Sequence, residues 1–140
     1  MVAPYFKVLL FAFNLYGIQK MNPEALNKIA HQWIDAFNRH DLEGLLTLYD
    51  DQAEHYSPKL KMRLPQTNGL IKGKDKLRAW WKDSFDRLPS LHYEIIQLTP
   101  FENRVFMEYI RHVMSEDDLR VGEMLEVRNE LIVFSRVYHS

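Results

Sequence analysis

The spacing of apolar residues changes near residue 90, and this change constrains the fold more than any other feature of the sequence. Between residues 22 and 88, apolar side chains recur every three or four positions, which is typical of amphipathic helices. From residue 91 onward, they alternate with polar residues at every second position, which is typical of half-buried strands. Helices followed by consecutive strands predict an α+β domain, with the helices on one face of a sheet.

Three helices are predicted in the first part of the chain. Asn22 is a capping residue, and it is followed by proline and an acidic residue, as at many helix starts. Asp41 is expected to cap the second helix in the same way. The predicted helices run from Pro23 to about Arg39, from Leu42 to Tyr49, and from residue 74 to Leu88, before Pro89. Residues 59–73 contain two glycines and a proline and are predicted to form a mobile loop.

A first short strand is predicted over "DDQAEHYSP", residues 50–58, and four more strands follow the helices. These four are expected over residues 91–99, 104–114, 121–128 and 131–139. The links between them are short, so neighbouring strands are expected to pair in antiparallel fashion.

Composition excludes several classes of protein. The 140 residues carry a formal net charge of −1 without an evident basic face, so a nucleic-acid partner is not expected. The chain contains no cysteine, which removes disulfides and thiolate chemistry and fits a cytoplasmic location. It also contains no phosphate-binding glycine loop, no nucleophile elbow and no metal-ligand spacing of histidines, so neither a cofactor nor a metal is predicted.

Residues 1–21 form an apolar N-terminal extension, separate from the domain predicted over residues 22–140. The apolar run follows Lys7, is interrupted by Asn14, and lacks a small-residue cleavage site. It is also too short and too interrupted for a clear membrane span. We expect a segment packed on the domain, or a start codon placed too early with Met21 as the natural beginning. A secretion signal or an anchor remains the alternative.

The order of elements resembles the nuclear transport factor 2-like superfamily, also called cystatin-like, and in particular its SnoaL-like and ketosteroid isomerase-like branch. The resemblance rests on "WIDAFNRHDLEGLLTLYDDQAEHYSP", "GLIKGKDKLRAWW" and "GEMLEVRNELIVFSRVYH" and covers residues 29 to 139. It implies a cone-shaped α+β barrel, with three N-terminal helices on a curved, mainly antiparallel sheet. It also implies a ligand site between the helices and the concave face, but no single activity, because the fold hosts several chemistries.

The resemblance assigns residues to this interior site. Ketosteroid isomerases use a catalytic base, a tyrosine in the oxyanion hole and a protonated acid. The resemblance implies that the corresponding positions in this chain are Ser57 for the base, Trp33 for the tyrosine, and a position near Glu123 for the acid. Two of these three roles are missing here, so steroid isomerisation is not predicted. Strand alternation places His55 and Ser57 inward and Tyr56 outward. The other expected wall residues are Tyr49 on the second helix, Trp80, Trp81, Tyr109 and His139.

Three residues are candidates for catalysis: His55, Glu123 and Arg111. His55 is either a hydrogen-bonded core residue or a general acid or base. Glu123 alternates with apolar residues, so it is either an ion-pair partner of Arg111 or a neutral acid whose pKa is raised. We favour the ion pair, with Tyr109 and Arg111 facing inward rather than Glu108 and His112, which would need further buried partners.

The sequence therefore predicts an interior pocket for a small, largely apolar ligand. One reading is a cofactor-independent acid–base enzyme of isomerase, cyclase, hydrolase or dehydratase type. A non-catalytic dimeric binding or interaction module is the alternative. The resemblance implies a homodimer, and the outer sheet face has the aromatic, methionine and arginine content of an interface. Its named residues are Met124, Phe134, Arg136 and Tyr138.

Overall fold

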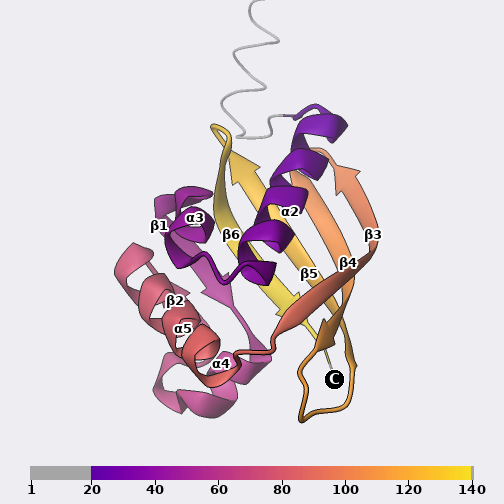
Figure 1. Ribbon diagram of the computed structural model, residues 1–140. Coiled ribbons are helices and arrows are strands. Elements are labelled where there is room, and N and C mark those ends of the chain that lie inside the picture. Colours follow the sequence, from indigo (N-terminus) through magenta and orange to yellow (C-terminus); the bar gives the residue numbers. More distant parts are fainter. Residues whose placement is uncertain (1–19, 140) are drawn as a thin grey trace, which may run out of the picture.

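The computed structural model describes residues 20–139, so most of the predicted extension over residues 1–21 lies outside the described residues. Met21 already contacts the domain, because its backbone N–H donates to the carbonyl oxygen of Glu102 at 2.9 Å. The elements in chain order are α2 (Pro23–Asn38), α3 (Leu42–Thr47), β1 (Tyr49–Tyr56), α4 (Pro58–Arg63), the 3-10 turn η1 (Pro65–Thr67), β2 (Leu70–Lys72), α5 (Lys74–Arg87), β3 (His92–Phe101), β4 (Arg104–His112), β5 (Leu119–Arg128) and β6 (Leu131–Tyr138) (Figure 1).

Side-chain caps fix the starts of three helices. The carboxamide oxygen of Asn22 accepts from the N–H of Glu24 at 2.8 Å, and Asp41 accepts from Gly44 at 3.0 Å. Ser57 caps α4 by accepting from the N–H of Lys59 at 3.2 Å, and proline stands at its first position. The predicted mobile loop over residues 59–73 is therefore wrong, because most of this segment forms α4, η1 and β2.

The six strands form one curved sheet in the order β2-β1-β6-β5-β4-β3. The meander from β3 to β6 is antiparallel, as predicted, whereas β1 pairs with β6 in parallel. The sheet does not close into a barrel, because β2 and β3 lie at its two edges. Tyr49 was expected on the second helix, but α3 ends at Thr47 and Tyr49 is the first residue of β1.

The helices lie on one side of the sheet, with α2 across β3 and β4 and α5 beside β1 (Figure 1). One polar side chain attaches α2 to the edge strand: Asn38 donates to the carbonyl oxygen of Tyr93 at 2.9 Å and accepts from its N–H at 2.7 Å. These two bonds satisfy the backbone N–H and C=O of Tyr93 on the edge strand. Within residues 20–139, no helix has the length and the apolar character needed to cross a bilayer.

The register of β4 and β5 differs from the prediction. Glu123 pairs with Met107, and Arg111 pairs with Leu119, so Glu123 and Arg111 are not opposite each other. The difference arises because β4 ends at His112 and β5 begins only at Leu119, so residues 113–118 connect the two strands. The connection is therefore longer than the four-residue turn that we expected. The alternation itself agrees with the prediction, since Tyr109 and Arg111 face inward.

The outer sheet face combines aromatic residues with an arginine. The guanidinium of Arg136 lies 4.6 Å from the ring centre of Tyr56 and 5.3 Å from that of Phe134. Phe106 and Tyr138 keep 41% and 51% of their surface exposed. An exposed aromatic face of this kind is typical of an interface, and we propose that it forms the homodimer contact.

The dimer proposal is tested by light scattering at micromolar concentration. The wild-type protein is expected to have the mass of a dimer, and Tyr138→Glu is expected to shift it to a monomer, because two carboxylates would be buried at the contact. Met114→Glu is the matched control, since Met114 is 90% exposed on the β4–β5 connection, away from this face. A wild-type protein that is monomeric throughout this range would contradict the proposal.

Candidate functional site

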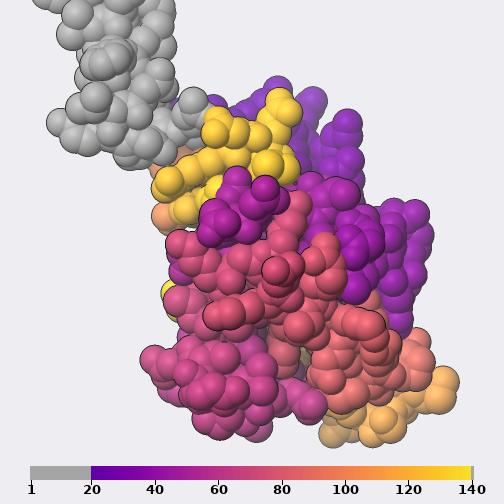
Figure 2. All heavy atoms as spheres, turned by 90° about the vertical axis from the view of Figure 1, so that its left-hand side faces the viewer, coloured from indigo at the N-terminus to yellow at the C-terminus, as the bar shows by residue number. Residues whose placement is uncertain are grey.

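A cavity of about 540 Å³ lies between the helices and the inner face of the sheet. Its walls come from α2, α4, α5 and from inward positions of all the long strands. Figure 2 looks onto α4 and α5, and a recess is visible between them. The volume suits a small organic molecule of one to three rings.

Two groups at the closed end of the cavity form a short hydrogen bond. The Tyr109 hydroxyl donates to Oε1 of Glu123 at 2.8 Å, and the glutamate is only 2% exposed. The other carboxyl oxygen, Oε2, is buried and has no hydrogen-bond partner among residues 20–139. Burial raises the pKa of Glu123 to about 8, although the Tyr109 hydrogen bond lowers it in part. Glu123 is therefore a neutral acid at neutral pH, with one oxygen available to a ligand.

Arg111 does not pair with Glu123, so the predicted ion pair is wrong. Its side chain is 9% exposed, and its Nη1 donates to Oε1 of Glu116 at 3.1 Å. The register explains this, because Arg111 lies four residues beyond Met107, the pairing partner of Glu123. The arginine thereby sits toward the open end of the cavity. The remaining alternative for Glu123, a carboxyl group with a raised pKa, is the one that fits the geometry.

A chain of buried hydrogen bonds runs behind the cavity wall. The indole N–H of Trp33 donates to the Tyr49 hydroxyl at 2.9 Å, and this hydroxyl donates to Oγ of Ser135 at 3.1 Å. Ser135 in turn contacts Nδ1 of His55 at 2.6 Å. These bonds link α2 to β1 and β6, so the helix and the parallel strand pair are held in one arrangement.

The direction of this chain indicates the tautomer of His55. An indole can only donate, so the hydroxyl hydrogen of Tyr49 goes to Ser135. We assign the hydroxyl hydrogen of Ser135 to Nδ1 of His55, which continues the chain in one direction. The hydrogen of the neutral imidazole is then on Nε2. Burial lowers the pKa of His55 to about 3, which keeps the ring neutral at physiological pH. His55 is thus a hydrogen-bond donor on the cavity wall and a weak base.

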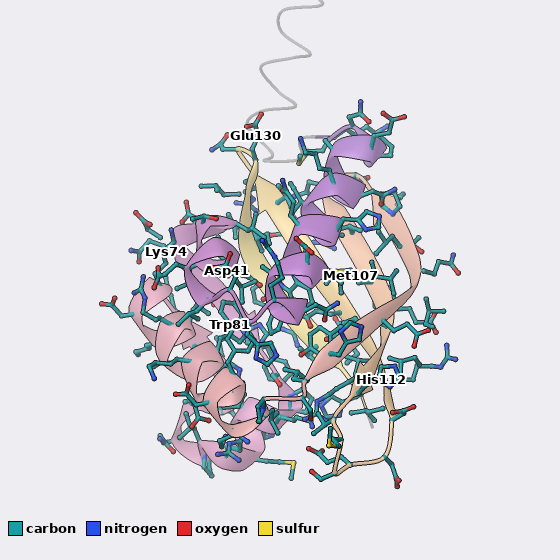
Figure 3. The ribbon with its side chains drawn as sticks, viewed as in Figure 1. Asp41, Lys74, Trp81, Met107, His112 and Glu130 are labelled. Carbon is teal, nitrogen blue, oxygen red and sulfur yellow. The ribbon has the colours of Figure 1, made fainter. Side chains whose placement is uncertain are left out.

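The structure places most of the predicted pocket residues on the cavity wall. These are Trp33, Ser57, Trp80, Trp81, Tyr109 and His139, together with His55, Arg111 and Glu123. Trp81 is buried and lies between α5 and the sheet (Figure 3), whereas its neighbour Trp80 is half-buried. Tyr49 was expected on the wall, but it lies one layer behind, where it joins Trp33 to Ser135.

Sequence reasoning missed several residues of the site. Tyr93 packs against Tyr109 with ring centres 4.4 Å apart and the rings tilted by 34°, and alternation along β3 could have placed it inward. Ser135 alternates with the outward residues of β6, so the same signal was available there. Lys59 and Glu116 lie in segments that were predicted as a loop or a turn, where periodicity gives no direction.

The described part of the chain contains no group of three or more histidine, cysteine, aspartate or glutamate side chains that could hold a metal ion. The polar groups of the cavity instead differ between its two ends. The donors and acceptors at its closed end come from Tyr109, Glu123 and His55, and its open end is lined by charged residues of α4, α5 and the β4–β5 connection.

Comparisons with known proteins agree with this architecture. Residues 30–135 match the family model of the SnoaL-like domain, so the chain belongs to the SnoaL-like domain family. No curated protein sequence matches the chain.

Solved structures show the same fold at low sequence identity. A SnoaL-like protein of unknown function from Burkholderia thailandensis is 23% identical with a TM-score of 0.77, over 86% of this chain and 98% of that one. A protein with a cystatin-like fold from Methylobium petroleophilum is 18% identical with a TM-score of 0.72, over 86% and 79%. A protein with a ketosteroid isomerase-like fold from Catenulispora acidiphila, in complex with trimethylamine, is 17% identical with a TM-score of 0.66, over 80% and 85%.

The neutral state of Glu123 predicts a characteristic dependence of stability on pH. The pKa of Glu123 is near 8 in the folded protein and 4.5 in the unfolded chain. The neutral carboxyl group therefore makes its full contribution to the free energy of unfolding below pH 4.5, and this contribution is lost as the pH rises from 4.5 through 8. Glu123→Gln should remove this fall, whose slope reaches about 1.4 kcal/mol per pH unit at most. Near pH 5 the variant should differ from wild type by no more than about 1 kcal/mol, because glutamine is nearly isosteric with the neutral carboxyl group. The difference should then grow in favour of the variant as the pH rises to 8.

Chemical denaturation of both proteins between pH 5 and 9 measures this difference. His55 and the other titrating groups are common to both proteins, so their contributions cancel in the comparison. Glu130→Gln, in the exposed β5–β6 turn, is the matched control and should keep the wild-type slope. Parallel stability curves for wild type and Glu123→Gln would mean that Glu123 is ionised in the folded protein.

Proposed function

We propose that the cavity binds a small, mostly apolar organic molecule through a carbonyl oxygen, and that Glu123 acts on this oxygen as a general acid. The observation that carries the proposal is the buried oxygen Oε2 of Glu123, which has no partner among residues 20–139. A protonated carboxyl group needs an acceptor for its hydrogen, and a buried donor without one is costly. A ligand carbonyl at the closed end would supply that acceptor.

Tyr109 supports this role from the other side of the carboxyl group. Burial raises the pKa of its phenol well above the usual value, so the hydroxyl keeps its hydrogen and donates it to Oε1. A donor at Oε1 draws electron density from the carboxyl group and makes the hydrogen on Oε2 a better donor. Nε2–H of His55 provides a further donor on the cavity wall.

The chemistry that suits these groups is acid-assisted reaction of a carbonyl compound. A base, which the closed end does not itself provide, would take a proton from the carbon next to the carbonyl group. The negative charge then moves to the carbonyl oxygen, and the hydrogen of Glu123 can be shared with this oxygen or transferred to it. A proton returned at a second carbon gives an isomerase, and attack of the resulting carbon on a second carbonyl gives a cyclase. No cofactor takes part in either sequence.

A second candidate function is non-catalytic binding of the same class of ligand. One observation favours it: the described residues provide donors at the closed end but no ionised carboxylate there. His55 is a weak base because burial lowers its pKa to about 3. A proton-transfer enzyme needs a base, so binding and turnover are separate questions for this site.

Binding is tested with 2-acetylnaphthalene and 2-ethylnaphthalene, which differ by the carbonyl oxygen. Wild type should bind the ketone about tenfold more tightly at pH 6.5, as measured by quenching of tryptophan fluorescence, because one buried hydrogen bond is worth about 1 kcal/mol or more. The preference should disappear above pH 8.5, where Glu123 is ionised. Glu123→Gln should keep it at both pH values, since an amide N–H still donates.

Equal affinity for the two compounds in wild type at pH 6.5 would contradict the role of Glu123. Turnover is measured separately, as exchange of the methyl hydrogens of 2-acetylnaphthalene with D₂O by NMR. Exchange faster than in buffer, and slowed about 100-fold or more in Glu123→Gln, would support the enzyme. Ketone-selective binding without faster exchange would favour the binding module.

A further inference from the structure

The open end of the cavity carries a cluster of cationic side chains, which we call the cationic rim: Lys59 and Arg63 on α4, Arg87 on α5, and Arg111 on β4. All four residues line the cavity. They come from three elements that are separate in sequence, so helical or strand periodicity does not account for their grouping. The elements that carry the rim, namely α4, the end of α5 and the end of β4, lie toward the lower end of the molecule in Figure 1.

The cations of the rim outnumber their acidic partners. Asp83 accepts from Nε of Arg87 at 2.8 Å and lies 3.7 Å from Arg63, so one carboxylate serves two arginines. Glu116 forms an ion pair with Arg111, with 3.1 Å between Oε1 of the glutamate and Nη1 of the arginine. Four positive groups therefore face two negative ones.

Lys59 is the least compensated of the four. It forms no ion pair within residues 20–139, and it is half-buried. Burial lowers its pKa, as do the nearby charges of Arg111 and Arg87, while Glu116 opposes this shift. The ammonium group thus lies in the field of two guanidinium groups. Of the other acids on the β4–β5 connection, Asp118 is engaged with His112 at 2.8 Å.

Most N–H donors of the Arg111 guanidinium have no acceptor among residues 20–139. Its side chain is more than nine-tenths buried on the cavity wall, and its guanidinium carries five N–H groups. Among the described residues, the bond from Nη1 to Glu116 is the one hydrogen bond that it forms. A buried guanidinium with unused donors beside an unpaired ammonium is the arrangement that binds a carboxylate or phosphate, because the planar fork matches two oxygens of such a group.

We propose that the ligand of this cavity is an anionic amphiphile, whose carboxylate or other oxyanion lies between Arg111 and Lys59 while its apolar body extends toward Glu123. This proposal rests on the cavity being a ligand pocket and adds the class of ligand. The backbone of Arg111 lies four residues, about 13 Å, along β4 from Met107, the pairing partner of Glu123. Aromatic side chains, among them Trp81 and Tyr93, line the space between.

The test compares 2-naphthoate with 2-naphthamide, which have the same shape and differ in charge. Wild type should bind the carboxylate at least about tenfold more tightly at pH 7 and low salt, and the preference should shrink as salt is added. A third probe, 2-naphthyl phosphate, distinguishes the two oxyanions: the tighter of the two anions identifies the headgroup that the rim fits. Equal or weaker binding of both anions than of the amide would overturn the proposal.

Two lysines on α4 provide a matched pair of variants. Lys59→Gln should reduce the preference for 2-naphthoate over 2-naphthamide by about three- to tenfold, whereas Lys61→Gln should leave it unchanged, because Lys61 is exposed and does not line the cavity. Both are helix-surface changes, and circular dichroism confirms that each variant is folded. The same loss in both variants would mean a general charge effect and would contradict a specific rim site.

Glu123→Gln separates this proposal from the proposed function. Because 2-naphthoate has no ketone, its preference over the amide should persist in Glu123→Gln within about twofold. If the protein discriminates naphthoate from naphthamide but not acetylnaphthalene from ethylnaphthalene, the anionic class of ligand is supported and the role of Glu123 is contradicted. The reverse result would support the role of Glu123 and contradict the binding of an anion at the cationic rim.

Discussion

Burial of a carboxyl group costs free energy unless the group is neutral or paired, and this constraint determines the chemistry of the closed end of the cavity. Glu123 faces the hydroxyl of Tyr109 and not an arginine, so the neutral form is favoured. A neutral acid can donate a hydrogen where a carboxylate could only accept one. Arg111 lies two inward positions along β4 from Met107, the pairing partner of Glu123, so its charge does not pair with the carboxyl group.

Depth in the cavity follows from position along the strands. Inward residues of β4 run from Met107 in the core through Tyr109 to Arg111 at the rim, and those of β5 run from Glu123 outward to Leu119. Each step of two residues moves a side chain about 7 Å along the same face. The sheet thus separates a neutral hydrogen-bonding end from a charged end, and helices α2 and α5 supply the apolar wall between them.

The fold followed from the sequence where the determining signal was local. Amphipathic periods over α2, α5 and the four-stranded meander are long enough to show which elements form, and strand parity alone placed Tyr109 and Arg111 inward. The helix α4 was missed because six residues are too few for a period to be visible, although the Ser57 cap was a signal for it.

The partner of Glu123 could not be predicted in the same way. Alternation along a strand fixes the face on which a residue lies, whereas register depends on the length of the connecting loop, here residues 113–118, which alternation does not reveal. The hydrogen-bond chain from Trp33 to His55 joins residues on α2, β1 and β6 that are far apart in sequence, so it too depends on tertiary structure. Local patterns cannot determine either.

The most direct measurement is an NMR titration of the glutamate side-chain carboxyl carbons in ¹³C-labelled protein from pH 4 to 10, with Glu123 assigned through the missing signal of Glu123→Gln. The Glu123 carbon is expected to shift with a midpoint near pH 8, while the protein remains folded. A midpoint at or below the ordinary glutamate value of 4.5 would show an ionised carboxylate at neutral pH and would contradict the role of Glu123 as a neutral acid.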